Sequence, residues 1–100
     1  MEMNATKIVE NPDWYVGEHC VVCGSPHVQK HHIIGGTANR KISDRYGYIL
    51  PLCYEHHIGA NGIHRNRGMQ LYWMQVAQMH YEKHHGTRSE FIKEFGRSYL

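Results

Sequence analysis

The sequence predicts a small α+β fold, and three features of the chain support this prediction. Short runs of β-branched and apolar residues, at 21–22 and 28–34, are bounded by glycine-containing turns, which is typical of short strands. Residues 69–85 repeat their apolar members at the spacing of an amphipathic helix. A helix-capping sequence follows directly after them. The strands are therefore expected before residue 68 and a pair of helices after it.

Length and composition limit the protein to one small domain with a thin core. The 100 residues are too few for a multidomain enzyme with a large enclosed cleft. Ile, Val, Leu and Phe supply only a fifth of the chain, and domains with so few core residues commonly need a disulfide or a structural metal. The 3 Cys and 10 His favour a metal, because an odd number of cysteines cannot pair completely within one chain.

The chain divides into three regions. Residues 1–18 are polar with scattered apolar positions and are expected to form an N-terminal arm. Residues 19–67 contain all the cysteines and most of the histidines, and this region is predicted to form the core domain that holds the functional site. Residues 68–100 are expected to form a C-terminal helical extension that packs on this core. Neither a signal peptide nor an apolar run long enough to span a membrane is recognisable, which favours a cytoplasmic protein.

The first C-terminal helix is predicted over residues 69–85. Gln75 and Gln78 fall largely on the face opposite its apolar residues. The aromatic residues of the apolar face are interpreted as core, since the chain is short of aliphatic residues. That face consists of Met69, Tyr72, Trp73, Val76, Ala77, His80 and Tyr81.

The second helix is predicted from its end signals. Gly86 ends the first helix, and Thr87-Arg-Ser-Glu90 then has the form of a capping box, in which the Thr and Glu side chains bind each other's backbone N–H groups. Gly96 is expected to stop this helix. Its predicted buried stripe is Phe91, Ile92 and Phe95.

Two residue pairs with the same internal spacing predict a zinc site. Cys20-x-x-Cys23 and Cys53-x-x-His56 each separate two ligands by two residues, which lets each pair contact one face of a tetrahedral ion. A structural Zn²⁺ bound by these four residues uses every cysteine and ties together the ends of the expected hairpin between them. His57 is an alternative to His56, although the equal spacing favours His56. A redox pair at Cys20 and Cys23 is the other alternative, but it gives Cys53 no role.

Nine histidines remain after His56 is assigned to the zinc, and the positions of four of them resemble those of a known family. His31-His32 lies between the zinc pairs, His57 directly follows the second pair, and His64 comes after a glycine-containing loop. Together with the two pairs, this pattern resembles the HNH nucleases, whose site is the ββα-metal or His-Me finger. Within that superfamily it is most similar to small phage HNH proteins and phage recombination-enhancement nucleases. The resemblance covers residues 19–67, about half of the chain.

The resemblance implies a metal-dependent DNA endonuclease with a ββα-metal core. His31, His57 and His64 match the ligands of a catalytic divalent metal, and His32 matches the general base. Adjacent strand residues point to opposite faces, so His31 and His32 are expected to differ in role. A neutral imidazole can take a proton from water, and the hydroxide then attacks a phosphodiester, leaving 5′-phosphate and 3′-hydroxyl ends. The family implies Mg²⁺ or Mn²⁺, with Ni²⁺, Co²⁺ or Zn²⁺ as alternatives because three imidazoles are softer ligands than Mg²⁺ prefers.

One position departs from the family pattern. Five residues before the second-pair Cys the family usually has the Asn that holds the loop carrying the base, and here that residue is Tyr48. Its phenolic hydroxyl can donate the same type of hydrogen bond, so Tyr48 is the predicted orienting residue. Asn39 and Asn61 are the alternatives.

Basic residues around the proposed site predict DNA as the partner. They suit phosphate contacts and include no recognisable base-reading module, so we expect weak sequence preference or selection of single-stranded or branched DNA. The family implies a phage-encoded protein that acts in DNA recombination or processing in the host cytoplasm, with a homodimer or a recombination protein as a further partner. No contact with a membrane is expected. The six cations are Lys30, Arg40, Lys41, Arg45, Arg65 and Arg67.

Two other functions compete with the nuclease. A non-catalytic zinc-stabilised nucleic-acid-binding module explains the cysteines and the cations, but it leaves the histidines at 31, 32, 57 and 64 without a purpose. A zinc-stabilised protein-interaction domain is the second alternative, and it is expected to have no affinity for DNA. The remaining histidines are expected to have ordinary roles, and His80 in particular is expected to be a hydrogen-bonded packing residue.

Overall fold

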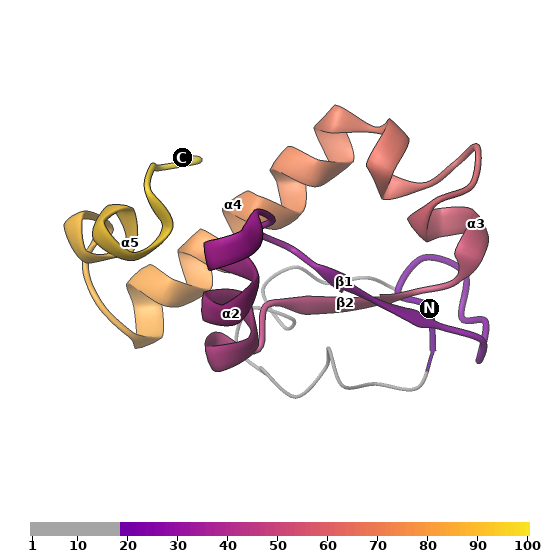
Figure 1. Ribbon diagram of the computed structural model, residues 1–100, viewed down its shortest axis with the longest axis horizontal. Helices are drawn as coiled ribbons and strands as arrows, with labels where there is room; N and C mark the ends of the chain where they lie inside the picture. Colours follow the sequence, from indigo (N-terminus) through magenta and orange to yellow (C-terminus); the bar gives the residue numbers. More distant parts are fainter. Residues whose placement is uncertain (1–18) are drawn as a thin grey trace.

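A two-stranded antiparallel sheet lies at the centre of the fold (Figure 1). The computed structural model describes residues 19–100, so the arm predicted at residues 1–18 lies outside the described part. Strand β1 (Gln29–His32) pairs with β2 (Ile49–Leu52) in a register that sets His31 opposite Leu50. The strands occur in the predicted region, although β1 is shorter than expected and residues 21–22 form a turn.

The strands are joined by a helix and not by the turn expected of a hairpin. Helix α2 (Thr37–Tyr46) follows Gly36 and ends at Gly47, whose φ of 78° lies in the left-handed region that favours glycine. Of its described side chains only Ser43 is fully buried, and Ser43 Oγ donates to the Ile34 carbonyl at 3.0 Å. Because α2 lacks a strong apolar stripe, the sequence pattern does not predict it.

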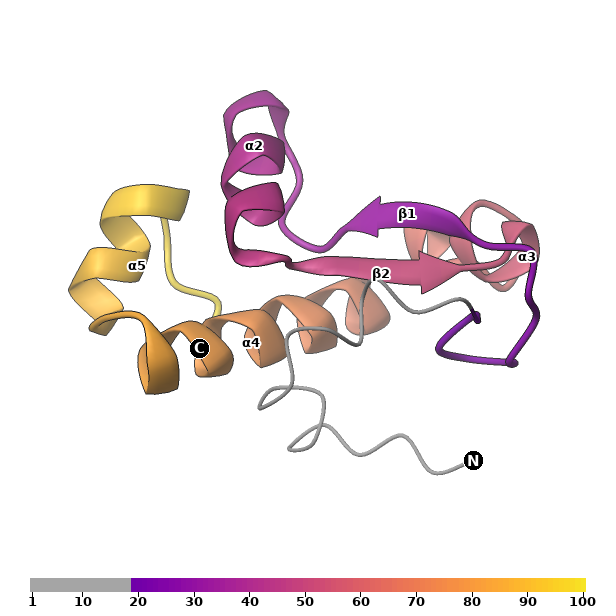
Figure 2. The ribbon, with the colours of Figure 1, turned by 90° about the horizontal axis from the view of Figure 1, so that it is seen from below.

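Helix α4 (Arg67–His84) runs along one side of the sheet, while α2 stands on the other side at one end of the strands (Figure 2). Between β2 and α4 the chain forms a short helix, α3 (Tyr54–His57), and a 3-10 turn, η2 (Ile63–Arg65). The side chain of Asn66 caps α4 by accepting the Met69 N–H at 2.9 Å, so this helix begins earlier than predicted.

The buried face of α4 agrees with the prediction except at two positions. Tyr72, predicted to be buried, is 45% exposed. Gln78, predicted on the opposite face, is completely buried because its amide binds the C-terminal tail. Its Oε1 accepts the Tyr99 N–H at 2.7 Å and its Nε2 donates to Ser98 Oγ at 2.9 Å, so both polar atoms of the amide have hydrogen-bond partners. Met69 is partly buried against the core, and the confirmed buried positions are Trp73, Val76, Ala77, His80 and Tyr81.

Helix α5 (Arg88–Phe95) confirms the predicted end signals. Thr87 Oγ1 accepts the Glu90 N–H and Glu90 Oε1 accepts the Thr87 N–H, which together form the capping box. Gly96 ends the helix with a φ of 96°, a conformation that favours glycine. Both ends of α5 are therefore set by residues close together in the sequence.

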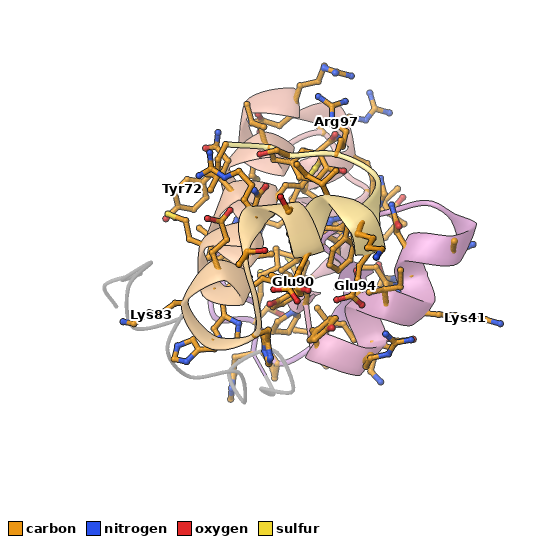
Figure 3. All side chains as sticks on the ribbon, turned by 90° about the vertical axis from the view of Figure 1, so that its left-hand side faces the viewer. Lys41, Tyr72, Lys83, Glu90, Glu94 and Arg97 are labelled. Atoms are coloured by element: carbon orange, nitrogen blue, oxygen red, sulfur yellow. The ribbon has the colours of Figure 1, made fainter. Side chains whose placement is uncertain are left out.

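Glu94 links α5 to the rest of the fold. Figure 3 shows Glu94 between α5 and α2, where it pairs with Arg45 at 3.2 Å. Its carboxylate also accepts hydrogen bonds from the hydroxyls of Tyr46 and Tyr81, each at 2.6 Å, so one side chain connects α5 with α2 and α4. The predicted buried stripe of α5 is confirmed for Phe91 and Phe95 and wrong for Ile92, which is 39% exposed.

The core lies between the sheet, α4 and α5, and aromatic rings supply much of it. The rings of Phe91 and Phe95 lie 4.6 Å apart between centroids, and Tyr81 packs edge-on against Phe91 at 5.3 Å. Within residues 19–100, every buried side-chain nitrogen and oxygen has a hydrogen-bond partner. None of the helices in this part of the chain has the length and hydropathy that crossing a bilayer requires. The predicted aromatic residues thus serve as core, with the exception of Tyr72.

The burial of His80 predicts that the fold weakens in mild acid. His80 is 5% exposed, and its Nδ1 lies 3.1 Å from the Tyr48 hydroxyl, which confirms the packing role predicted for it. Burial, together with the neighbouring His84 and His85, lowers the pKa of His80 from 6.5 to about 4. On acidification the unfolded chain takes up this proton before the folded chain does. Stability that is present above pH 6.5 is therefore lost as the pH falls toward 4.

Replacing His80 by Leu should remove this part of the pH dependence. Between pH 7.5 and pH 5.5 we expect the wild type to lose about 1 kcal/mol more of its free energy of unfolding than His80→Leu, measured by urea denaturation. His27→Leu changes an exposed histidine and should behave as the wild type does. Equal losses in the wild type and His80→Leu would contradict this role for His80.

Candidate metal centres and the pocket beside them

Three cysteines and one histidine converge in the first centre. Cys20 and Cys23 come from the turn before β1, Cys53 directly follows β2, and His56 lies on α3. Cys23 Sγ lies 3.7 Å from Cys53 Sγ, while His56 Nδ1 lies 3.2 Å from Cys53 Sγ and 3.8 Å from Cys20 Sγ. With Zn–S bonds of about 2.3 Å and Zn–N bonds of about 2.0 Å, a tetrahedron requires about 3.7 Å between sulfurs and about 3.5 Å between sulfur and nitrogen. The four side chains can therefore hold a metal ion such as zinc.

Main-chain hydrogen bonds hold the turn from Cys20 to Cys23 at the end of β2. The Val21 N–H donates to the Pro51 carbonyl at 3.0 Å, which fastens the turn to the strand. The Gly24 N–H donates to the Cys20 carbonyl at 2.9 Å, and Gly24 has a φ of 81°, which favours glycine. The two thiols of the turn are thereby held close to the cysteine that follows β2.

The electrostatics of Cys20 favour a bound thiolate. Burial raises the pKa of this thiol, but the backbone N–H groups of Cys53, Cys23 and Val22 outweigh burial and lower the pKa to about 6. At Cys23 the backbone N–H of Ser25 lowers the pKa, but desolvation and the neighbouring cysteine sulfurs outweigh it, so the pKa lies above its ordinary value. Several thiolates packed together repel one another unless a cation lies between them, which is the arrangement of a structural metal site.

Three histidines from different elements form the second centre. His31 comes from β1, His57 from α3 and His64 from η2, and one ring nitrogen of each lies within 4.8 Å of the others. Adjacent residues of a helix point in directions about 100° apart, so His56 faces the cysteines while His57 faces the other two histidines. The structure thus decides between His56 and His57 as the partner of the cysteines. It also brings together the three residues predicted to share a second metal.

Hydrogen bonds and a tight loop position His57 and His64. Gln29 Oε1 accepts from His57 Nδ1 at 2.7 Å, which leaves Nε2 as the ring nitrogen with a free lone pair. The loop between the two histidines turns so closely that a Cβ on Gly62 would lie 2.6 Å from the His57 carbonyl oxygen. Gln70 of α4 donates to a carbonyl of η2 at 2.8 Å and holds the turn that carries His64. His57 and the turn that carries His64 are therefore both held by residues outside the cluster.

Two rings of this second centre, those of His31 and His57, are neutral at physiological pH. Burial, with additional repulsion from the neighbouring histidines, lowers the pKa of His31 to about 4. Burial and then His64 lower the pKa of His57. A neutral imidazole keeps the lone pair that binds a metal ion. Three imidazoles suit a borderline cation such as Zn²⁺ or Ni²⁺ better than hard Mg²⁺.

The predicted base, His32, lies beside this cluster and is held by Asp44 of α2. His32 is the last residue of β1, and its Nε2 lies 2.9 Å from Asp44 Oδ1. A carboxylate only accepts hydrogen bonds, so the ring proton lies on Nε2 and the lone pair on Nδ1. The two side chains are 26% and 59% exposed, which leaves the pair accessible to water.

Tyr48, predicted to orient the base, directs its hydroxyl elsewhere. The hydroxyl forms a buried hydrogen bond of 3.1 Å with Nδ1 of His80, a residue of α4. The Tyr48 carbonyl accepts the Ile33 N–H at 2.9 Å, so its main chain holds the end of β1 just after the base. The group that orients the ring of His32 is the carboxylate of Asp44. Tyr48 is thus part of the core.

The two asparagines considered as alternatives to Tyr48 also have structural partners. Asn39 Nδ2 donates to the Phe95 carbonyl at 3.4 Å and connects α2 with the end of α5. Asn61 Nδ2 donates to Glu55 Oε2 at 2.9 Å within the loop between α3 and η2. The second contact supports the loop that leads to His64.

An open pocket of about 490 Å³ connects the histidine cluster with the base. All four histidines of the proposed reaction line it, together with Lys30 and Arg40. Arg45 instead pairs with a carboxylate of α5 at 3.2 Å, and Arg67 lines a neighbouring hollow. Two of the six predicted cations therefore lie at the site itself. The remaining two, Lys41 and Arg65, are exposed.

Sequence reasoning missed Gln29, Asp44 and Gln70, which support the site. Gln29 carries a usable signal, because it lies two residues before His31 on one strand and so shares its face. Asp44 and Gln70 carry no such signal, since their roles depend on how α2 and α4 pack against the site.

The two centres differ in the chemistry that they can support. The first is a thiolate-rich set with two buried cysteines, which suits a structural ion. The second opens into a pocket beside a candidate general base, which suits chemistry on a bound ligand. Comparison of the chain with protein-family models, with curated proteins and with solved structures gives no match.

Proposed function

We propose that the protein is a metal-dependent DNA endonuclease with a zinc-stapled ββα-metal site of the HNH type in residues 19–67. The observation that carries this proposal is the shared pocket, in which three imidazoles suited to a cation lie beside His32 and its partner Asp44. The order of two antiparallel strands followed by α3 supports the ββα assignment, with α2 inserted between the strands.

In this proposal His32 is the general base. Its Nδ1 takes a proton from water, and the oxygen of that water attacks the phosphorus while the bond to the 3′ oxygen breaks. The departing 3′ oxygen takes a proton from solvent water, so the products carry 5′-phosphate and 3′-hydroxyl ends. Asp44 keeps the ring in the required tautomer and stabilises the imidazolium that forms.

His31, His57 and His64 would hold the divalent cation of the reaction. When bound, that cation supplies positive charge that neutralises the phosphate and stabilises the departing oxygen. Imidazole ligands carry no negative charge, so they do not cancel the positive charge that the phosphate experiences. The depressed pKa values of His31 and His57 keep these two rings neutral at the pH of the cell.

Lys30 and Arg40 support a nucleic acid as the substrate. Both line the pocket, where a cation next to the reacting phosphodiester binds a neighbouring phosphate. The alternative function, a non-catalytic zinc-stabilised nucleic-acid-binding module, uses the same cations. It provides no reason for three imidazoles to converge beside a histidine–aspartate pair, so the nuclease explains more of the site.

Cleavage of plasmid DNA tests the proposal. The full-length protein with its zinc should nick or linearise supercoiled plasmid in the presence of Mg²⁺, Mn²⁺, Co²⁺ or Ni²⁺. His57→Ala should lower the initial rate at least about 100-fold, because charge neutralisation by a metal contributes several kcal/mol to the transition state. His27→Ala, which changes an exposed histidine outside the pocket, should cleave at the wild-type rate.

The other outcomes separate the competing functions. A plasmid that is retarded in the gel but uncut with all four metals would reject the nuclease and favour the nucleic-acid-binding module. A plasmid that is neither retarded nor cut would favour a protein-interaction domain.

A further inference from the structure

A second hollow continues the proposed active-site pocket along α4. Gln70 and Met74 line both hollows, so the two hollows are adjacent. It has a volume of about 400 Å³ and is formed by the start of α4 and by the tail that follows α5. Its remaining side chains include Arg67, Leu71, Arg97 and Tyr99.

The second hollow combines positive charge, an aromatic ring and apolar surface. Arg97 lies over the ring of Tyr99, with Cζ 5.2 Å from the ring centroid. Among the described residues, neither Arg67 nor Arg97 forms an ion pair with a carboxylate. Leu71 adds an apolar side chain that is 45% exposed. These groups are thus available to a ligand with negative charge and a flat aromatic surface.

The protein holds this arrangement in place by fastening its C-terminal tail to α4. Gln75 Nε2 donates to the Tyr99 carbonyl at 2.9 Å, and Gln78 Oε1 accepts the Tyr99 N–H at 2.7 Å. Gln78 is completely buried, so the anchor belongs to the interior. The Tyr99 ring also packs edge-on against Phe91, with centroids 6.2 Å apart. Because these contacts order Arg97 and Tyr99 in advance, a ligand bears less of that entropic cost on binding.

We propose that this second hollow binds an unpaired nucleotide next to the scissile phosphate, so that the preferred substrate is DNA with a single-stranded segment. The inference rests on the proposed nuclease function. Aromatic rings and guanidinium planes stack on free base faces while cations follow the phosphates, and single-strand-binding surfaces combine these two features. A duplex keeps its base faces inside its own stack and can use only the cations.

The size and position of the hollow fit this assignment. Its volume lies near the lower end of the range for pockets that enclose a small ligand, which suits one nucleotide and not the width of a duplex. The wall that it shares with the catalytic pocket places that nucleotide directly beside the reacting phosphodiester. Arg67 and Arg97 complement the phosphates on either side of the stacked base.

Equilibrium binding of two fluorescein-labelled DNAs tests the proposal. The full-length protein carries His32→Ala so that DNA is not cut, and the ligands are a short oligothymidylate and a hairpin duplex. Tyr99→Leu should weaken binding of the oligothymidylate about tenfold, the effect of losing one stacking platform, and should leave the affinity for the duplex unchanged. Tyr99→Phe keeps the ring and should bind as the parent protein does.

Tyr72→Leu is a matched control for the Tyr99 variants, and the contacts of Tyr99 indicate that these variants will fold. Tyr72→Leu removes an exposed tyrosine that lies on α4 outside both hollows, and it should change neither affinity. Figure 3 shows Tyr72 and Arg97 projecting in different directions. The tail is anchored through the main chain of Tyr99, so replacing its ring leaves those hydrogen bonds in place.

Two results would overturn this assignment. Oligothymidylate binding that does not change in Tyr99→Leu would reject the nucleotide site, and so would equal weakening for both DNAs. If plasmid cleavage still depends on His57 in that case, the nuclease function stands and only the nucleotide site fails. Tyr99-dependent binding of the single strand without plasmid cleavage by any metal supports the nucleotide site and rejects the nuclease.

Discussion

His32→Ala is expected to lower the rate of DNA cleavage by a factor of about 10²–10⁴, the usual contribution of a general base, while the fold and the zinc content stay unchanged. The ring of His32 does not support the core, since its side chain is 26% exposed and that of its partner Asp44 is 59% exposed. An exposed pair of this kind contributes at most about 1 kcal/mol to the free energy of unfolding. Initial rates on plasmid DNA, thermal denaturation and zinc analysis measure the three quantities.

Further variants make this test specific to the base. Asp44→Asn keeps the shape of the side chain but removes its charge, so a smaller loss of rate is expected, about tenfold. His27→Ala should cleave as the wild type does. Cleavage by His32→Ala at the wild-type rate would show that another group takes the proton, and it would remove the main support for the proposed mechanism.

Cys20→Ser is expected to leave most of the protein unfolded, because it removes one ligand of the proposed structural metal. Structural zinc ions contribute about 10–16 kcal/mol to the folding of small domains, whereas such domains are stable by only about 5–15 kcal/mol. A serine hydroxyl does not replace a thiolate as a zinc ligand. Circular dichroism and zinc analysis of the purified variant measure the loss of structure and of metal.

A control in the same turn separates the loss of the ligand from a disturbance of the backbone. Val22→Ser changes a side chain that is 48% exposed in this turn, and it should retain the zinc and the fold. Removing the metal from the wild type with a chelator should unfold it as Cys20→Ser does, and added Zn²⁺ should restore the structure. A folded, stable Cys20→Ser protein without zinc would reject the structural role of the metal.

The correct predictions concern features that neighbouring residues build. The equal spacing around Cys20 and Cys53 identifies four side chains that the structure brings together. Two ligands separated by two residues can contact the same metal ion in many different folds. The capping box between Thr87 and Glu90 is confirmed for the same reason, since a helix end depends on side chains three residues apart. The apolar positions of α4 are largely confirmed because helical periodicity is also local.

The missed features depend on partners far away in the chain. Asp44 lies 12 residues after His32, on a polar helix that has no apolar stripe from which it could be predicted. Gln78 is buried only because it binds Tyr99, which lies 21 residues further along the chain. Local patterns in the sequence were therefore enough to identify the ligand pairs and the ends of the last helix. The tertiary packing decided which polar side chains act together, because a hydrogen bond between distant residues forms only when the whole chain brings them within reach.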